Sequence, residues 1–158
     1  MVTSSRDMRR KTPPPCPPQN ATTTTVRHVV NFYETDAMGI VHHSNYVRFL
    51  EHARVQFLSE HDRPYAAYVA EGLHVPVTRV EVRYQRACRF ADAIDIKCWV
   101  SWARSASLGF TYHLSVDGVF VASADSDHAI VNEAGIPVRI PEHMQVRLSA
   151  WLGQRGPG

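Results

Sequence analysis

The chain has 158 residues, of which 44% are hydrophobic and 20% are charged, a composition typical of a single globular domain. Four of its 17 basic residues and one of its 15 acidic residues fall within positions 1–25, so the rest of the chain is nearly neutral. This balance excludes the basic face of a nucleic-acid-binding domain, and no apolar run approaches the roughly 20 residues that cross a bilayer.

Residues 1–25 are rich in proline and threonine. They hold five of the ten prolines and four consecutive threonines, but only one strong hydrophobe besides two methionines, Val2. Such a segment cannot bury enough apolar surface to offset the entropy lost on ordering. We therefore predict a disordered tail over residues 1–25, one domain over 26–151 and a flexible C-terminal tail over 152–158.

The first predicted element of the domain is a strand over residues 26–33, where apolar and polar residues alternate. A turn containing glycine follows, and then a helix over residues 44–59. Seven apolar or aromatic side chains cover a wide arc of this helix, so we expect it to be mostly buried. A short second helix is predicted over residues 64–71, with Pro64 in its first turn and Gly72 just past its end.

The remainder reads as strands with a period of two. These are expected over residues 78–85, 94–100, 108–116 and 119–123. The dipeptide Asp117-Gly118 predicts a type I′ hairpin, residues 103–106 a second turn, and residues 142–151 a short terminal helix. One long helix followed by an antiparallel meander is an α+β fold, in which a curved sheet wraps a central helix. The outer strands of such a sheet need covering, which favours an oligomer.

The segment between Tyr33 and Tyr46 contains the candidate catalytic residues. It places the carboxylate of Asp36 at the end of the first strand, just before the unpaired N–H groups at the start of the long helix. A carboxylate can attack a carbonyl or activate water, while such N–H groups stabilise the oxygen that gains charge. The alternative is that Asp36 only shapes a turn, as aspartates often do.

This segment resembles the hotdog-fold acyl-CoA thioesterases, of the 4-hydroxybenzoyl-CoA thioesterase type and its Tol–Pal-associated bacterial relatives. The resemblance rests on Tyr33-x-Thr35-Asp36-x-x-Gly39-x-Val41-x-His43-x-x-Tyr46, continued by Phe49-x-Glu51-x-Ala53-Arg54, and covers roughly residues 26–141. It implies a hotdog fold, with a long central helix wrapped by about five antiparallel strands. It also implies a homodimer with a continuous sheet, or a homotetramer, with active sites at the dimer interface.

The resemblance also implies roles for single residues. Asp36 matches the catalytic carboxylate, and the backbone N–H at His43 would polarise the thioester carbonyl, with the His43 side chain as a second possible contributor. Gly39, Val41 and Tyr46 match substrate-binding positions of the motif. Some relatives carry a functional tyrosine four residues before the aspartate, where this chain has Phe32, so a tyrosine hydroxyl in that role is doubtful.

Other assignments remain open. Glu51 is a rival base, although an ion pair with Arg54 or an interface contact is favoured. Ser44 and Asn45 are expected to cap the helix. A metal site built on Asp36, His42 and His43 is disfavoured, because no fourth ligand is evident.

Coenzyme A would need cations for its phosphates. Among the arginines that follow the helix, Arg89 and Arg104 are the preferred contacts, because both are expected at turns.

The predicted function is hydrolysis of an acyl- or aroyl-CoA to the free acid and CoA. No metal or cofactor is expected, because coenzyme A is part of the substrate. The alternatives are a non-catalytic acyl-CoA-binding module and an acyl-thioester hydratase or dehydratase. Three cysteines without a CxxC spacing and a start without an apolar signal core favour the cytoplasm, with an organelle-targeting leader as the alternative.

Overall fold

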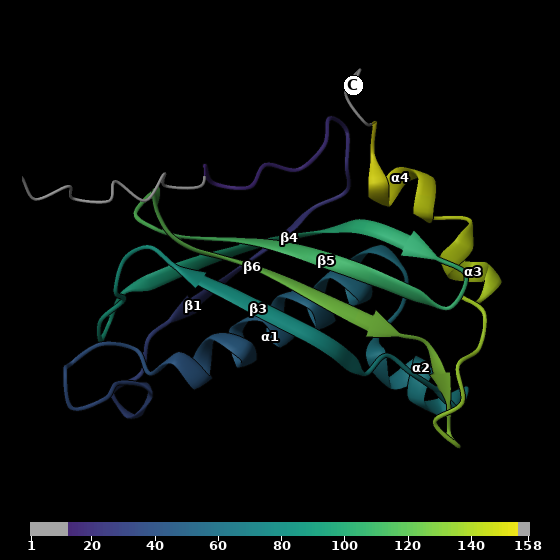
Figure 1. Ribbon diagram of the computed structural model, residues 1–158, viewed down its shortest axis with the longest axis horizontal. Coiled ribbons are helices and arrows are strands. Elements are labelled where there is room, and N and C mark those ends of the chain that lie inside the picture. Colours follow the sequence, from purple (N-terminus) through teal and green to yellow (C-terminus); the bar gives the residue numbers. More distant parts are fainter. Residues whose placement is uncertain (1–12, 155–158) are drawn as a thin grey trace, which may run out of the picture.

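The computed structural model of the protein describes residues 13–154. Within them, five antiparallel strands form one sheet in the order β1-β4-β5-β6-β3. The strands are β1 (Thr24–Val29), β3 (Val77–Tyr84), β4 (Ala93–Arg104), β5 (Ser107–Val116) and β6 (Val119–Ala129). The long helix α1 (His43–His61) lies against one face of this sheet (Figure 1). The predicted α+β architecture is confirmed.

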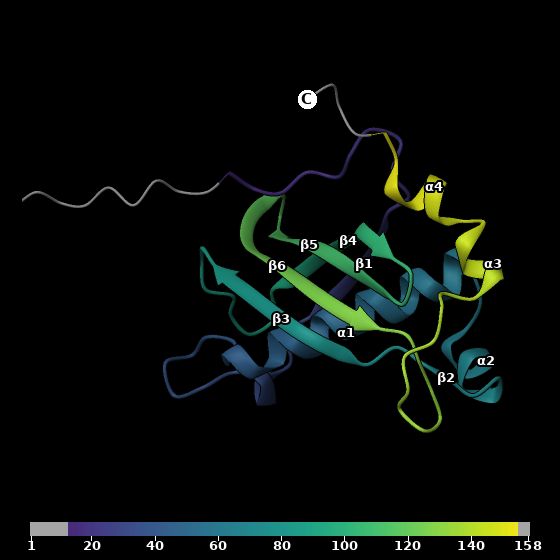
Figure 2. The same ribbon diagram turned by 45° about the vertical axis from the view of Figure 1, so that its right-hand side comes forward.

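The smaller elements lie around the ends of the sheet (Figure 2). They are a 3-10 turn η1 (Phe32–Glu34), α2 (Tyr65–Ala70), the paired short strands β2 (Leu73–His74) and β7 (Val131–Asn132), α3 (Glu142–Gln145) and α4 (Leu148–Leu152). The single terminal helix predicted over residues 142–151 is therefore two short helices. No helix of the described residues is long and apolar enough to cross a membrane.

The core fixes the position of α1. Its inward face presents seven buried residues, Tyr46, Phe49, Leu50, Ala53, Arg54, Phe57 and Leu58. Phe57 meets Phe110 of β5 edge to face, with ring centroids 5.4 Å apart. Burying each large apolar side chain contributes about 1.5–3 kcal/mol, so the direction of α1 is strongly determined. The place of its first turn is determined with it.

A tight turn and a β-bulge shape the sheet. Asp117 and Gly118 both have positive φ, 50° and 75°, as the predicted type I′ turn requires. A bulge lies between Val100 and Trp102 of β4, and the Trp102 indole covers Gly109 on β5 so closely that a Cβ there would collide with it. Bulges bend and twist the sheet, which helps it curve around α1.

The predicted first strand is too long. β1 ends at Val29, and Phe32 and Tyr33 lie in η1 with 76% and 79% of their surface exposed. The last strand of the hairpin is longer than predicted, because β6 continues to Ala129. In this extension of β6 the buried positions are occupied by Ser126 and His128. Because both residues are polar, the sequence does not show the alternation of apolar and polar residues that marks a half-buried strand.

The predicted tails also need correction. Thr24 and Thr25 already belong to β1, and Gln19 forms an antiparallel bridge with Gln154. The N–H of Thr22 donates to the carbonyl of Ala150 at 3.2 Å. Residues 19–25 are therefore held by contacts with Ala150 and Gln154 and, from Thr24, by pairing with β4, contrary to the predicted disorder. The rest of that prediction, for residues 1–12 and 155–158, lies outside the described residues.

A buried carboxylate joins α1 to the C-terminal helices. Asp62, just after α1, has no exposed side-chain surface. It accepts hydrogen bonds from Nε of Arg147 at 2.8 Å, from the hydroxyl of Tyr68, and lies 2.9 Å from Nδ1 of His143. This cluster ties α2, α3 and the residue before α4 to the end of α1.

Candidate active site

Asp36 sits in a tight turn between η1 and α1. Its N–H donates to the carbonyl of Ile40, and its own carbonyl accepts from Gly39, both at 2.9 Å. Gly39 has φ +74°, a conformation that other residues adopt only with strain. Oδ1 of Asp36 accepts the N–H of Met38 at 2.8 Å. The turn therefore holds the carboxylate in one orientation.

The helix begins one residue earlier than predicted, at His43. Its N-cap is His42, whose ring Nδ1 accepts the N–H of Ser44 at 3.2 Å. The predicted caps, Ser44 and Asn45, are therefore wrong; the Asn45 amide instead donates to the carbonyl of Glu34 at 2.8 Å. As the first helical residue, His43 has a backbone N–H with no intrahelical acceptor, at the positive end of the helix dipole.

A hydrogen bond between the buried Glu34 and the partly buried His28 lies next to the turn. Oε2 of Glu34 lies 2.8 Å from Nε2 of His28 on β1 and accepts the N–H of Asn31, also at 2.8 Å. Burial raises the pKa of Glu34, but the hydrogen bonds from His28 and Asn31 outweigh it, so the pKa is lowered. Sequence reasoning missed this pair, because β1 ends at Val29, between His28 and Glu34, so no single periodicity relates the two residues.

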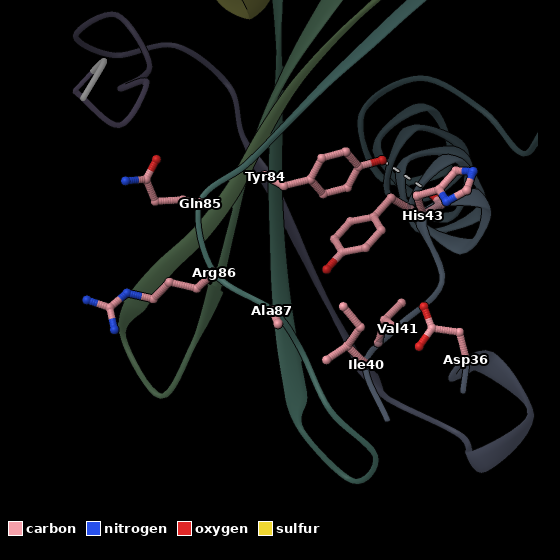
Figure 3. A pocket seen from close by; sticks show the side chains of 9 residues that line it. Asp36, Ile40, Val41, His43, Tyr84, Gln85, Arg86 and Ala87 are labelled. Atoms are coloured by element: carbon pink, nitrogen blue, oxygen red, sulfur yellow. Dashed lines mark hydrogen bonds between the residues drawn. The ribbon is translucent and has the colours of Figure 1, made fainter. Parts of the chain in front are cut away.

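Asp36 and His43 border one cavity of about 290 Å³ between the start of α1 and the end of β3. Figure 3 shows the Asp36 carboxylate on one wall, below the first turn of α1, with Tyr84 reaching across from β3. The Tyr84 hydroxyl donates to the carbonyl of His43 at 3.5 Å, and its ring meets Tyr46 edge to face at 4.9 Å. Of the predicted residues, Asp36, Val41, His43 and Tyr46 all line this cavity.

The loop between β3 and β4 brings arginines to the cavity. The N–H of Val41 donates to the carbonyl of Cys88 at 2.8 Å, and Ile40 bridges Arg89. A Cβ on Gly39 would lie 3.9 Å from Nη1 of Arg89, so Gly39 and Arg89 stand beside each other next to Ile40, at the rim of the cavity and not among its lining residues. Arg86, which was not among the preferred arginines, lines the cavity directly.

Arg104 does not reach this cavity within one chain. It ends β4, whose first residue Ala93 lies near the site, and twelve residues of strand span roughly 36 Å. Figure 1 shows the two ends of β4 at opposite ends of the molecule. The guanidinium of Arg104 lies instead 5.5 Å from the centroid of Trp102.

Glu51 is not part of this cavity. It is exposed on α1, and none of the ion pairs among residues 13–154 joins it to Arg54; the predicted pair between them is wrong. Within the same residues, no three histidine, cysteine or acidic side chains come close enough to hold a metal ion.

The arrangement suits attack on a polarised carbonyl. It combines an oriented carboxylate, a free N–H at a helix start and an open cavity with cationic side chains at its rim. The N–H and the helix dipole can stabilise negative charge on a carbonyl oxygen here without reorganising. A substrate with a phosphate-bearing portion would find its counter-charges at Arg86 and Arg89.

Comparison with known proteins identifies relatives. The model of the thioesterase-like superfamily matches residues 30–148. The acyl-CoA thioester hydrolase YbgC of Escherichia coli is 31% identical over 118 residues, which are 73% of this chain and 81% of that protein.

Solved structures agree. A hypothetical protein from Thermus thermophilus superposes with a TM-score of 0.77 at 32% identity, covering 82% of this chain and 98% of the other. The DHNA-CoA thioesterase of Staphylococcus aureus shares the fold with a TM-score of 0.76 at 22% identity, covering 82% and 88%.

Proposed function

Because the chain belongs to the thioesterase-like superfamily of hotdog-fold thioester hydrolases, we propose that it hydrolyses an acyl- or aroyl-CoA to the free acid and CoA. Asp36 is the nucleophile or the general base, and the His43 N–H is the oxyanion donor. The observation that carries this assignment is the Asp36 carboxylate, held by the N–H of Met38 in the cavity that the first turn of α1 borders.

As a general base, Asp36 removes a proton from water while the water oxygen bonds to the thioester carbon. The carbonyl electrons move to the oxygen, where the His43 N–H and the helix dipole stabilise them. Collapse breaks the C–S bond, and the CoA sulfur leaves and gains a proton. As a nucleophile, Asp36 instead forms a mixed anhydride and expels CoA, and water then cleaves the anhydride. Both routes give the same products.

Coenzyme A enters as part of the substrate, and no further cofactor takes part. Its phosphates are bound by Arg89 and Arg86 at the rim, where both guanidinium groups are exposed and free to reach a ligand. Gly39 contributes by adopting the positive φ of +74° that the turn holding Asp36 requires. The free state of Cys88 and Cys98 supports a reducing cytoplasm as the site of action.

The working unit is a homodimer, or a homotetramer built from such dimers. The outer edge of β3 has no partner strand within residues 13–154. Along it, Val77 and Val80 are 48% and 40% exposed, although both are apolar. Pairing of β3 with β3 of a second copy would satisfy this edge and make the sheet continuous. The cavity beside Tyr84 would then lie at the interface.

Two measurements test the function. Release of free thiol from a panel of alkanoyl-CoA and aroyl-CoA substrates is expected for a thioesterase. Tight CoA binding without thiol release would indicate a binding module, and a hydrated or dehydrated acyl-CoA without thiol release would indicate the hydratase chemistry.

The assembly has its own test. Light scattering should give at least twice the 17.8 kDa of one chain. The variant Val80→Lys, which places a charge on the β3 edge, should shift the protein toward monomers and reduce activity. A fully active monomer would contradict the shared site.

A further inference from the structure

A second cavity lies further along the groove between α1 and the edge strand β3. Its volume is about 110 Å³. Val47 and Leu50 of α1 and Val77 and Val80 of β3 give it apolar walls. A water molecule occupies about 30 Å³ of liquid, so the cavity has room for a small group but not for coenzyme A.

The cavity contains a buried, unneutralised charge. Arg54 lines it and is only 5% exposed. No carboxylate lies within 4 Å of its guanidinium among residues 13–154. Leaving a buried charge without a partner costs several kcal/mol. The site therefore favours an anion that the described part of the chain does not supply.

Apart from Glu51, the other polar groups of the cavity bring no negative charge. The Tyr112 hydroxyl lies 2.8 Å from Oγ of Ser126, which lies 2.7 Å from Nε2 of His128. Nδ1 of His128 is buried without a hydrogen-bond partner in the described structure. Burial, and then the charge of Arg54, lower the pKa of His128 to about 4, so its ring is neutral at neutral pH. Glu51 also lines the cavity, but it is exposed and unpaired with Arg54.

We propose that this cavity receives a carboxylate at the far end of the acyl group, so that the enzyme prefers thioesters of dicarboxylic acids with CoA. The inference rests on the proposed function. The guanidinium supplies a charge-assisted, two-pronged contact to a carboxylate, and the valines and Leu50 line a path for methylene groups. His43 and Arg54 are eleven residues apart on α1, which is about 16 Å along the helix. This separation favours a chain of intermediate length.

The proposal predicts that the enzyme prefers acyl groups ending in a carboxylate over acyl groups ending in a methyl, which a purely apolar acyl pocket would not do. The substrates are succinyl-, glutaryl-, adipoyl- and suberoyl-CoA, each paired with the methyl-ended acyl-CoA of the same chain length. For at least one length, kcat/KM should favour the carboxylate-ended member about tenfold or more, as expected for one charge-assisted hydrogen bond. The effect should lie mainly in KM, since Arg54 does not touch the reacting carbon.

Substitutions of Arg54 and Glu51 test whether the selectivity for a terminal carboxylate arises in this cavity. Arg54→Met should abolish the preference while leaving hydrolysis of the methyl-ended substrate within a few-fold of wild type, and Arg54→Lys should retain part of it. Glu51→Gln removes a negative charge from the same wall and should raise the preference several-fold. The last two variants keep the test decisive if Arg54→Met does not fold.

Two results would overturn the proposal. One is equal kcat/KM for both members of every pair. The other is dissociation of the oligomer by Arg54→Met with an unchanged preference, which would mean that Arg54 pairs with a carboxylate of a second copy. Hydrolysis of the methyl-ended substrates tests the proposed thioesterase activity independently of the carboxylate preference. If neither kind were hydrolysed, calorimetric binding of glutaryl-CoA and pentanoyl-CoA to wild type and Arg54→Lys would still decide whether the cavity selects a carboxylate.

Discussion

Oδ1 of Asp36 accepts the backbone N–H of Met38 at 2.8 Å, which leaves the second carboxylate oxygen for the substrate. In Asp36→Asn the amide oxygen can keep the bond to Met38, so the turn should survive while the base is lost. We expect kcat to fall roughly 10²-fold or more, because general-base catalysis is commonly worth 10²–10⁴. KM should change much less. Thiol-release kinetics with the best acyl-CoA, and a melting temperature to confirm folding, provide the measurement.

The matched control is Glu51→Gln, which removes the rival carboxylate on α1. Measured with a methyl-ended acyl-CoA, its kcat should stay within a few-fold of wild type. If Glu51→Gln lost turnover while Asp36→Asn kept it, with both proteins folded, the assignment of the base would be wrong.

The two histidines at the start of α1 should have separable effects. His42→Ala removes the N-cap acceptor for Ser44 and should lower the free energy of unfolding by about 1 kcal/mol, the usual value of a cap. His43→Ala keeps the backbone N–H, so kcat should fall less than tenfold if that N–H alone serves the carbonyl. Urea titration gives the first value and steady-state kinetics the second. A 10²-fold loss in folded His43→Ala would show that the imidazole itself takes part.

Asp62 should be critical for stability although it lies outside the cavity. Asp62→Asn removes the buried charge that accepts hydrogen bonds from Arg147 and Tyr68 and lies beside His143, and losing hydrogen bonds to a charged group costs about 1.5–3 kcal/mol. Glu71→Gln, which breaks the exposed pair with Arg63 and a longer contact with His143 at 3.8 Å, should cost under about 1 kcal/mol. Denaturant unfolding of both variants measures the difference. Similar losses for the two would show that burial does not set the strength of the Asp62 cluster.

His128 should make stability depend on pH. Burial, and then the charge of Arg54, lower its pKa from 6.5 to about 4. Between these two pH values His128 therefore binds a proton in the unfolded chain but not in the folded chain. The free energy of unfolding should therefore decrease as pH falls, by about 2 kcal/mol between pH 6.5 and 5.

The variant His128→Gln should lack this part of the slope, even if it is less stable overall. Burial also lowers the pKa of His113, which is only half-buried, so His113→Gln should alter the slope less. Urea unfolding at a series of pH values, at one protein concentration, measures both. An unchanged slope in His128→Gln would show that the histidine is charged in the folded protein.

Periodicity predicted the long helix, the antiparallel sheet and the hairpin at Asp117-Gly118 because apolar burial imposes these patterns directly. It placed Asp36 before the helix start for the same reason. It failed at His42, since a histidine ring seldom serves as an N-cap and only the local geometry reveals that it does. The strand end at Val29 was also hidden, because the alternation of apolar residues continues by coincidence into η1.

Contacts between distant segments lie beyond such patterns. The sequence favoured an ion pair between Glu51 and Arg54 on the helix, yet Arg54 is buried beside His128, which is 74 positions away in the chain. Tyr84 and Arg86 reach the cavity only because β3 ends beside the first turn of α1. A single sequence holds no local signal for such approaches.

The bridge between Gln19 and Gln154 has a practical consequence for engineering. It brings Gln19 and Gln154 together beside α4, away from the loop that leads into the start of α1 (Figures 1 and 2). A short linker could therefore join these positions into a circular permutant with new ends in the exposed turn at Asp117-Gly118. The linker would lie beside α4, so it would leave the Asp36 cavity at the start of α1 unobstructed.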